Sequence, residues 1–232
     1  MSRIGDTFDK FFGRRKGHGL SPRQQVLVDE LLPRISVNVE GVEAGALDPY
    51  SLFDIPVKDV WLEVGFGKGE HLVALARANP DIGFIGCEPF INGVVGLLAQ
   101  VDDLGLKNVR VYADDARHVM DALADGSISR AFLLHPDPWP KKKHARRRFM
   151  SQVNLDRFSR LLKVGSEFRM GSDHDLYVRW TLIQMHGRAD FNWMAERPSD
   201  WRVRPADWPE TRYENKALEG RASYLRFTRV AA

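Results

Sequence analysis

At 232 residues the chain is long enough for one sizeable α/β domain with some length left for an extension. Its composition, 44% apolar and 28% charged, is ordinary for a globular protein, and a net charge of +3 points to no particular partner. The single cysteine, Cys87, excludes intramolecular disulfides and any multi-cysteine zinc site. The longest apolar stretch is far too short to span a bilayer and no signal-peptide h-region is present, so we expect a cytoplasmic protein without a membrane partner.

The N-terminal residues differ in character from the rest of the chain. Residues 1–20 mix glycines, charges and phenylalanines, and we expect a flexible basic arm there, ahead of one domain over 21–232. The basic run at 14–16 suits either a soluble tail or an RNA contact. Ser21, Pro22 and Gln24 are typical of a helix start, with Ser21 as N-cap and Gln24 completing a capping box.

Beyond an irregular connection at 38–58, short apolar runs alternate with helical patterns. The expected strands lie at 60–64, 83–86, 108–112, 131–134, 166–170 and 225–229. The expected helices lie at 71–78, 92–104, 118–123, 155–162 and 176–186. Such alternation predicts an α/β fold with a parallel, doubly wound sheet and right-handed crossovers.

Four consecutive strand ends carry acidic residues: Glu63, Glu88, Asp114-Asp115 and Asp137. In an open α/β sheet, ligands bind outside the carboxyl ends of the strands, near the point where the strand order reverses. Glu88 is spaced to accept the hydroxyls of a ribose, and Asp115-Ala116 to accept the amino group of an adenine. The sequence therefore predicts a cofactor that contains adenosine.

Glycines at 65, 67 and 69 follow the first strand, where they let the backbone approach a ligand and free the amides that begin the next helix. A dinucleotide normally requires G-x-G-x-x-G, but the spacing here is G-x-G-x-G, and Glu63 would repel phosphates. S-adenosylmethionine (SAM) carries an ammonium, a sulfonium and no phosphate. It is the better fit, and the missing Ser or Thr after Lys68 excludes a Walker loop.

We expect the active site to be organised around the stretch at 132–148, FLLHPDPWPKKKHARRR. Its apolar start is typical of a buried strand, and its three prolines forbid a helix or a central strand after it. A rigid loop with one carboxylate, Asp137, and one large aromatic, Trp139, suits a flat ring held beside an acid. The basic run after that loop suits a polyanion, so we interpret the stretch as a catalytic loop joined to a nucleic-acid clamp.

Other candidates receive simpler interpretations. Cys87 at a strand end is more typical of a small buried hydrophobe than of a nucleophile. The seven histidines show no metal-ligand spacing, so no metal is expected. The tryptophans at 193, 201 and 208 suit packing better than base stacking, and His135 suits a hydrogen-bonded loop position.

Several segments together resemble the tRNA (guanine-N7)-methyltransferases of the bacterial TrmB type. They are LEVGFGKGEHL at 62–72, IGCEP at 85–89, DDA at 114–116, HPDPWPKKKHARRR at 135–148, SDH at 172–174 and TRYENK at 211–216. The resemblance covers nearly the whole chain after the arm. Pro140 and Tyr213 replace the family's more usual histidine and phenylalanine, and neither change removes a charged role.

The resemblance implies a Rossmann-like class I SAM-dependent methyltransferase fold with a C-terminal antiparallel strand. It implies SAM as cofactor, a guanosine in the variable loop of tRNA (position 46) as substrate, and a monomer or homodimer without an obligate protein partner. Cofactor residues would be Glu63, Gly65, Gly67, Glu88, Asp115, Ala116 and Asp137. Substrate residues would be Lys141, Asp173, Thr211, Arg212, Tyr213 and Glu214, and RNA contacts Lys143, His144, Arg146, Arg147 and Arg148.

The chemistry of this transfer makes modest demands on the protein. Guanine N7 has an in-plane lone pair and no proton, so no general base is needed. The protein then has to position N7 in line with the methyl group of the sulfonium. The product ring gains positive charge, which a nearby carboxylate would stabilise, and Asp137 is the candidate for that catalytic role. Asp173 and Glu214 suit the N1–H and amino donors that distinguish guanine from adenine.

Three rivals remain open from the residues alone. A nicotinamide oxidoreductase would leave the Asp-Pro-Trp loop and the basic run unexplained. A non-enzymatic RNA-binding protein on a degenerate methyltransferase fold would be favoured had the acids been lost. An amino-group methyltransferase typically carries Asp/Asn-Pro-Pro-aromatic after the fourth strand, which matches Asp137-Pro138-Trp139 poorly.

Overall fold

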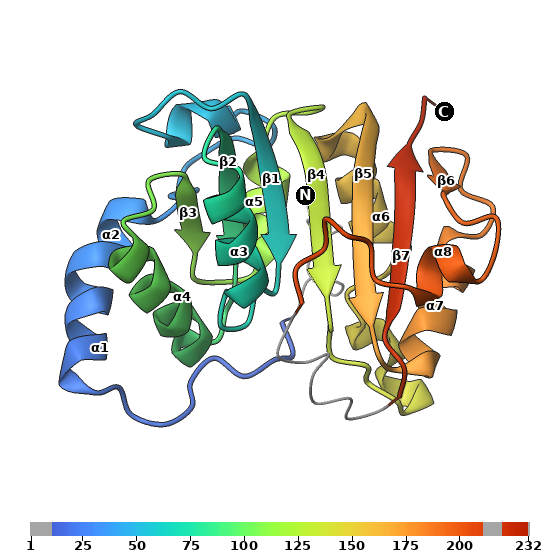
Figure 1. Cartoon of the computed structure of the whole chain (residues 1–232), viewed down its shortest axis with the longest axis horizontal. Helices are drawn as coiled ribbons and strands as arrows, with labels where there is room; N and C mark the ends of the chain where they lie inside the picture. The colour runs from blue at the N-terminus through green and yellow to red at the C-terminus, as the bar shows by residue number, and fades with distance from the viewer. Residues whose placement is uncertain (1–10, 211–219, 232) are drawn as a thin grey trace, which may run out of the picture.

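The computed structural model describes residues 11–210 and 220–231, and a seven-stranded sheet forms its centre (Figure 1). The strands are β1 (Asp59–Val64), β2 (Ile82–Cys87), β3 (Val109–Tyr112), β4 (Ile128–Leu134), β5 (Leu162–Ser172), β6 (Phe191–Trp193) and β7 (Ser223–Arg229), in the order β3-β2-β1-β4-β5-β7-β6. The first five pair in parallel, and β7 is antiparallel to both β5 and β6. The predicted mostly parallel sheet with a C-terminal antiparallel strand is confirmed.

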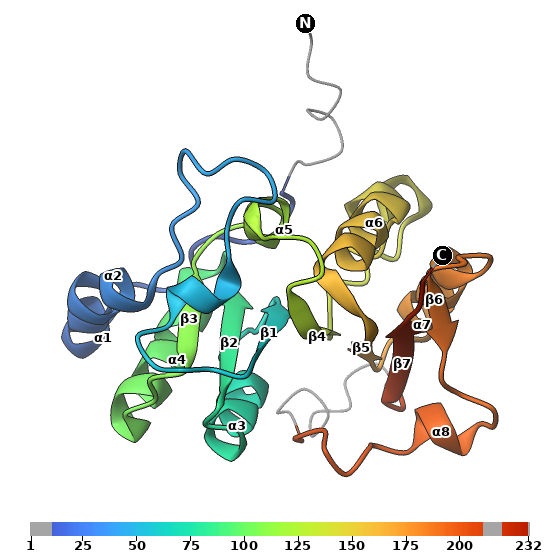
Figure 2. The same cartoon turned by 90° about the horizontal axis from the view of Figure 1, so that it is seen from above.

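Helices cover both faces of the sheet, with α3 and α4 on one side and α5 and α6 on the other (Figure 2). The helical segments are α1 (Pro22–Val26), a π-helical turn (Leu27–Leu31), α2 (Leu32–Ile35), the 3₁₀ helix η2 (Pro49–Leu52), α3 (Glu70–Ala78), α4 (Ile91–Leu104), α5 (Ala116–Ala122), the 3₁₀ helix η3 (Lys142–Arg147), α6 (Gln152–Leu161), α7 (Asp175–Met185) and α8 (Ser199–Arg202). The predicted capping box begins α1, with Ser21 and Gln24 bonded to each other's backbone amides.

Each face of the sheet builds its own apolar core, because successive side chains of a strand point to opposite faces. In β1, Val60, Leu62 and Val64 join the core beneath α5 and α6. Trp61 packs into the core beneath α3 and α4. The residue between Leu62 and Val64, Glu63, is therefore directed toward the α3 side.

The bounds of several strands differ from the predicted ranges, and the largest differences are at β5 and β6. β5 starts at Leu162, four residues earlier than expected, and runs through Gly165, which has a φ of 87°. Its pairing with β4 is irregular between Ile128 and Arg130, and the strand continues through that irregularity. β6 was not predicted because three residues are too few to show a period-2 pattern.

Candidate active site

The strand order reverses between β1 and β4, and the carboxyl ends of three strands are level there. Val64 of β1 lies opposite Cys87 of β2 and Leu133 of β4. The residues that come after these three strands therefore meet at one edge of the sheet, which is where ligands bind in open α/β folds.

The glycine loop after β1 needs its glycines. Gly65, Gly67 and Gly69 have φ angles of 73°, 58° and 82°, in the left-handed region that residues with a Cβ avoid. Gly93 of α4 packs so closely that a Cβ there would lie 2.4 Å from the carbonyl oxygen of Gly67. The loop is thus held between the sheet and α4 with its backbone toward the sheet edge.

Glu88 connects the glycine loop to α4. Its Oε2 accepts a hydrogen bond from the amide of Gly67 at 2.9 Å, and its Oε1 accepts one from the amide of Phe90 at 3.0 Å. Burial raises the pKa of Glu88, and the charges of Asp137 and Glu63 add to that rise, while the two amides oppose it. A carboxylate held this way keeps further lone pairs for hydroxyl donors of a ligand.

Asp115 begins α5 and is 5% exposed. Its Oδ1 accepts from the amide of Arg117 at 3.1 Å, and the Nε of Arg117 lies 2.9 Å from Oδ1 and 3.0 Å from Oδ2. Arg117 therefore fixes the orientation of this carboxylate, a contact that no sequence motif indicates. Asp114, by contrast, pairs with Arg15 at 2.6 Å.

These groups surround one cavity of about 1000 Å³. Six of the seven predicted cofactor residues line it: Gly65, Gly67, Glu88, Asp115, Ala116 and Asp137. Its size is at the upper end of the range for small-molecule sites, so an adenosine-containing cofactor and part of a substrate base have room. The binding role of each residue stays a prediction.

Glu63, the seventh predicted cofactor residue, is placed differently. It is 4% exposed and is not among the residues that line the cavity. Its Oε2 lies 2.7 Å from Nδ1 of His71 on α3, and the imidazole packs against Phe132 with ring centroids 4.9 Å apart. Strand alternation directs this side chain toward α3, while its charge still contributes to the raised pKa of Glu88, so its role at the cofactor stays a prediction.

The loop after β4 carries backbone strain. His135 and Trp139 have φ angles of 46° and 42°, each costing roughly 1–3 kcal/mol for a residue with a Cβ. Between them Asp137 is exposed and lines the cavity. Arg147 stacks on the ring of Trp139, with the guanidinium carbon 4.8 Å from the ring centroid. The Trp139 ring is therefore held by Arg147, and the binding of a substrate ring beside Asp137 stays a prediction.

The basic run divides into outward and inward side chains. Lys141, Lys143 and Arg146 are exposed, and His144 and Arg147 are half-buried. Desolvation, followed by the nearby cations, lowers the pKa of His144. Arg148 is only 7% exposed, and its guanidinium bonds backbone carbonyls. Its guanidinium is thus directed inward, while the RNA contacts predicted for this run stay predictions.

Part of the N-terminal arm borders the cavity. The cavity lining includes residues 11–14, and Arg147 stacks on Phe12 at 4.7 Å. Asn92 at the start of α4 holds the arm with two hydrogen bonds of 2.8 Å, accepting from the amide of Gly17 and donating to the carbonyl of His18. Residues 11–18 are thus held in place, within a segment for which the sequence predicts a flexible arm.

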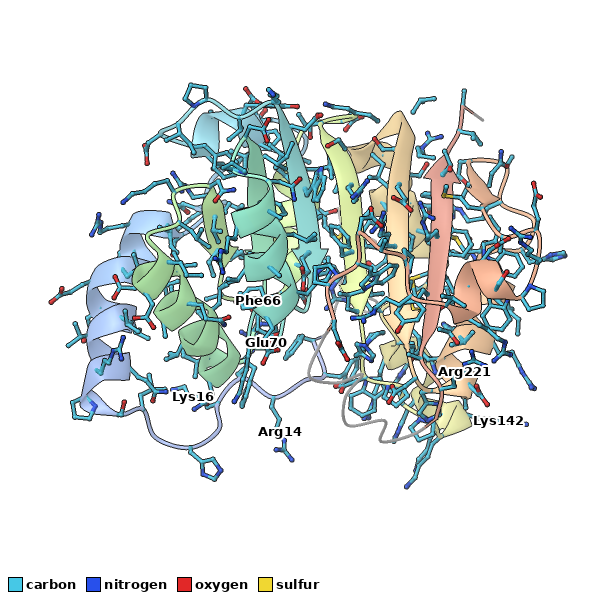
Figure 3. All side chains as sticks on the ribbon, viewed as in Figure 1. Arg14, Lys16, Phe66, Glu70, Lys142 and Arg221 are labelled. Carbon is cyan, nitrogen blue, oxygen red and sulfur yellow. The ribbon has the colours of Figure 1, made fainter. Side chains whose placement is uncertain are left out.

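Positive side chains of the arm and of the basic run share one edge of the molecule. In Figure 3, Arg14 and Lys16 lie along the lower edge, where the parallel strands end, and Lys142 lies farther along the same edge. Arg14 and Arg146 are both among the residues that line the cavity, so cations of the arm and of the basic run border it. A polyanion lying along this edge would lie beside the cavity.

The predicted substrate residues are only partly covered. Asp173 follows β5, is half-buried, and lies with its Oδ1 3.5 Å from Nδ1 of His135. Lys141 is exposed beside the cavity loop. Thr211, Arg212, Tyr213 and Glu214 lie outside the described residues.

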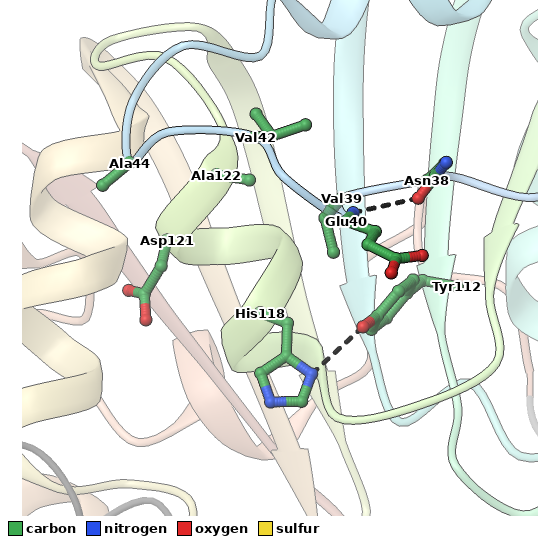
Figure 4. A pocket seen from close by; sticks show the side chains of 9 residues that line it. All are labelled: Asn38, Val39, Glu40, Val42, Ala44, Tyr112, His118, Asp121 and Ala122. Carbon is green, nitrogen blue, oxygen red and sulfur yellow. Dashed lines mark hydrogen bonds between the residues drawn. The ribbon is translucent and has the colours of Figure 1, made fainter.

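A second hollow of about 420 Å³ lies between α5 and the residues that follow α2 (Figure 4). Its walls include Glu40, Asp121, and the pair Tyr112 and His118, whose Oη and Nδ1 are 3.0 Å apart. It contains neither the glycine loop nor Asp137, so the larger cavity is the candidate site.

Cys87 is 1% exposed and its pKa is raised by burial, as expected for a small buried hydrophobe rather than a nucleophile.

Comparison with known proteins agrees with the geometry. The model of a family described as "Putative methyltransferase" matches residues 58–226. A tRNA (guanine-N(7)-)-methyltransferase of Rhodospirillum rubrum is 50% identical over 223 residues, which cover 95% of this chain and 88% of the relative. The one from Zymomonas mobilis is 46% identical over 97% of this chain and 96% of its own length. The chain belongs to the tRNA (guanine-N7)-methyltransferase family.

Membership in this family confirms the predicted resemblance, and solved structures confirm the fold. An rRNA methylase from Streptococcus thermophilus superposes with a TM-score of 0.52 at 12% identity, over 76% of this chain and 90% of its own. A SAM-dependent O-methyltransferase from Thermotoga maritima superposes with a TM-score of 0.51 at 17% identity, over 89% and 72%. The chain is thus a SAM-dependent methyltransferase, and its fold is the class I methyltransferase fold.

Two negative observations concern residues 11–210 and 220–231 only. None of their helices is long and apolar enough to cross a bilayer. Nor do these residues hold three or more His, Cys, Asp or Glu side chains grouped as a metal ion requires.

Proposed function

We propose that this protein transfers a methyl group from SAM to N7 of a guanosine in tRNA, at position 46 in the variable loop. The observation that carries the proposal is a single cavity that joins the glycine loop, Glu88 and Asp115 to Asp137 and is bordered by exposed cations. The relatives from Rhodospirillum rubrum and Zymomonas mobilis, both tRNA (guanine-N(7)-)-methyltransferases, support the same assignment.

The residues present fit SAM better than a dinucleotide. Glu88 and Asp115 offer carboxylate oxygens to ribose hydroxyls and to the amino group of adenine. Gly65 leaves open space where a side chain would stand, with nothing within 4 Å of an added Cβ. A pyrophosphate at the glycine loop would instead meet the negative charge of Glu88, whose Oε2 bonds Gly67. SAM, when bound, supplies an electrophilic methyl group on a sulfonium.

Asp137 is the proposed catalytic residue. The guanine N7 lone pair needs no base, so the protein has to orient the ring and stabilise the positive charge that develops on it. Asp137 is exposed to the cavity on a loop that its neighbours hold rigidly, and its carboxylate is suited to that charge. Trp139, two residues after Asp137 and stacked with Arg147, offers an aromatic ring on the same loop.

The exposed cations suit the tRNA backbone. Lys141 precedes η3, and Lys143 and Arg146 lie within it, directly after the loop that carries Asp137. Phosphates bound there would hold the tRNA beside the cavity that Arg146 and Asp137 both line. Phosphate contacts of this kind position a nucleic acid without reading its sequence. Recognition of guanine then falls to acceptors near the cavity, of which Asp173 is the described candidate.

The test is transfer of labelled methyl from SAM to an unmodified tRNA transcript, followed by nucleoside analysis. Wild type should form 7-methylguanosine, and a transcript with adenosine at position 46 should not be labelled. Asp137→Ala and Asp137→Asn should each lower kcat by about 100-fold or more while binding the cofactor normally. Label in another nucleoside would refute the N7 assignment, and label in the position-46 variant would refute the site.

A further inference from the structure

The loop that carries Asp137 is closed at its base by one side chain. Trp139 adopts a left-handed backbone conformation (φ 42°) that a residue with a Cβ rarely adopts without support. Two hydrogen bonds from Arg148 meet this point, since its Nε donates to the carbonyl of Pro138 and its Nη2 to the carbonyl of Trp139, both at 3.0 Å. The carbonyl oxygens of the two residues that follow Asp137 are thus bound by one guanidinium.

The geometry of these bonds requires arginine. A guanidinium presents its donors in a rigid planar fork, so two adjacent carbonyls are fixed relative to each other. A lysine ammonium is a point charge on a flexible stem and reproduces neither the spacing nor the plane. Arg148 is 7% exposed, so water competes little for these two hydrogen bonds.

Helix α7 supports the guanidinium from below. Trp180 lies under it, with the guanidinium carbon 4.6 Å from the ring centroid, and its Nε1 donates to the carbonyl of Met150 at 2.5 Å. The amide of Met150 donates to the hydroxyl of the fully buried Tyr177 at 3.1 Å. Both backbone groups of a residue two positions after Arg148 are therefore anchored to α7, which places Arg148 within the rigid part of the fold.

We infer that Arg148 is a positioning residue for methyl transfer, one that sets the orientation of Asp137 through the carbonyls of Pro138 and Trp139. The inference rests on the proposed role of Asp137 and adds a residue that acts through it. Arg146, two positions earlier and exposed, provides the contrast, because its charge is free to meet phosphates. Two arginines of one basic run thus serve the reaction in different ways.

Steady-state kinetics separate the two roles, with tRNA as the varied substrate at saturating SAM. Arg148→Ala and Arg148→Lys should lower kcat by about 10- to 100-fold with KM for tRNA within about twofold of wild type. The matched control Arg146→Ala should raise KM, keep kcat near wild type, and reduce the salt slope of binding by about one. An Arg148→Ala enzyme with wild-type kcat, raised KM and a weaker salt slope would overturn the inference.

Arg148→Lys keeps the charge and tests whether the guanidinium is needed, even if Arg148→Ala fails to fold. Thermal melting and binding of S-adenosylhomocysteine establish that each variant is folded. Wild-type kcat in Arg148→Lys would show that the fork is not needed. With folded Arg148→Ala, millimolar guanidinium should restore part of kcat, whereas sodium at equal ionic strength and guanidinium on Arg146→Ala should not. Failure of that rescue would assign the loss to packing on Trp180 and refute the clamp.

Hydrogen exchange provides a readout that needs no activity. Without tRNA, amides in 139–147 should exchange faster in Arg148→Lys than in wild type, and unchanged exchange would contradict the clamp. Absence of 7-methylguanosine from the wild-type reaction would refute the proposed function. The exchange rates would still show separately whether Arg148 holds the loop.

Discussion

The carboxylate of Glu88 accepts a hydrogen bond of 2.9 Å from the amide of Gly67, so the end of β2 holds the loop after β1. Burial raises the pKa of Glu88 above its usual value of 4.5. The folded protein therefore holds this proton more tightly than the unfolded chain does. The stability that Glu88 contributes is full below about pH 4.5 and declines as the pH rises through the folded pKa.

Glu88→Gln removes the ionisable group and should remove that decline. The free energy of unfolding, measured by denaturant titration between pH 4 and 7, should fall less with pH in the variant than in wild type. Glu30→Gln, at an exposed position of the π-helical turn, is the control and should follow the wild-type curve. Identical pH dependence in wild type and Glu88→Gln would contradict the burial effect.

Gly93→Ala tests how closely α4 packs on the glycine loop. The new Cβ would lie 2.4 Å from the carbonyl oxygen of Gly67, which is backbone and has to move. We expect affinity for S-adenosylhomocysteine to fall roughly tenfold, the scale of an overpacked contact. Gly19→Ala meets nothing within 4 Å and should bind as wild type does in the same calorimetric titration. Equal affinity of both variants would show that the loop adapts freely.

Asn92 tests the contact between the arm and the cavity. Asn92→Ala removes both 2.8 Å hydrogen bonds to the arm, and hydrogen exchange at the amide of Gly17 should accelerate several-fold. Asn92→Asp keeps the acceptor for Gly17 but cannot donate to His18, so its exchange should be intermediate. If the arm covers bound cofactor, both variants should also release S-adenosylhomocysteine faster in stopped-flow measurements. An unchanged exchange rate in Asn92→Ala would show that other contacts hold the arm.

Substitutions of Glu63 test whether its carboxylate stabilises the fold or binds the cofactor. Breaking a buried ionic or hydrogen-bonded pair costs about 3–5 kcal/mol when one partner is removed, so Glu63→Ala should lower Tm clearly. Glu63→Gln keeps a hydrogen-bonding group beside His71 and should recover much of that loss. Because the carboxylate faces α3, affinity for the cofactor in Glu63→Gln should stay within about twofold of wild type. A tenfold loss of affinity at unchanged Tm would support the predicted role of Glu63 as a cofactor ligand.

The placement of most site residues could be predicted because it depends on strand ends. A parallel sheet brings the carboxyl ends of its strands to one edge, so Glu88, Asp115 and Asp137 had to meet once their strands were identified. The glycines at 65 and 67 were equally predictable, because the left-handed φ they adopt is strongly biased toward glycine.

The direction of individual side chains could not be predicted from the sequence. Glu63 and Val64 are neighbours in sequence, yet one side chain faces α3 and the other the opposite core, and a strand-end acid gives no sign of which. Arg146 and Arg148 belong to one basic run, but the turn of η3 leaves the first exposed and directs the second to two carbonyls and Trp180. The contact of Asn92 with the arm spans 74 residues and has no local pattern.

The family, the order of the strands along the chain and the chemistry available at their ends could thus be derived from the sequence alone. They depend on local periodicity, on turn residues and on the types of side chain present. Which charges reach the cavity, which are buried as supports and how the arm borders the cavity became clear only from the folded chain. Those outcomes depend on packing between segments far apart in sequence, where burial and hydrogen-bond geometry outweigh the preference of any single residue.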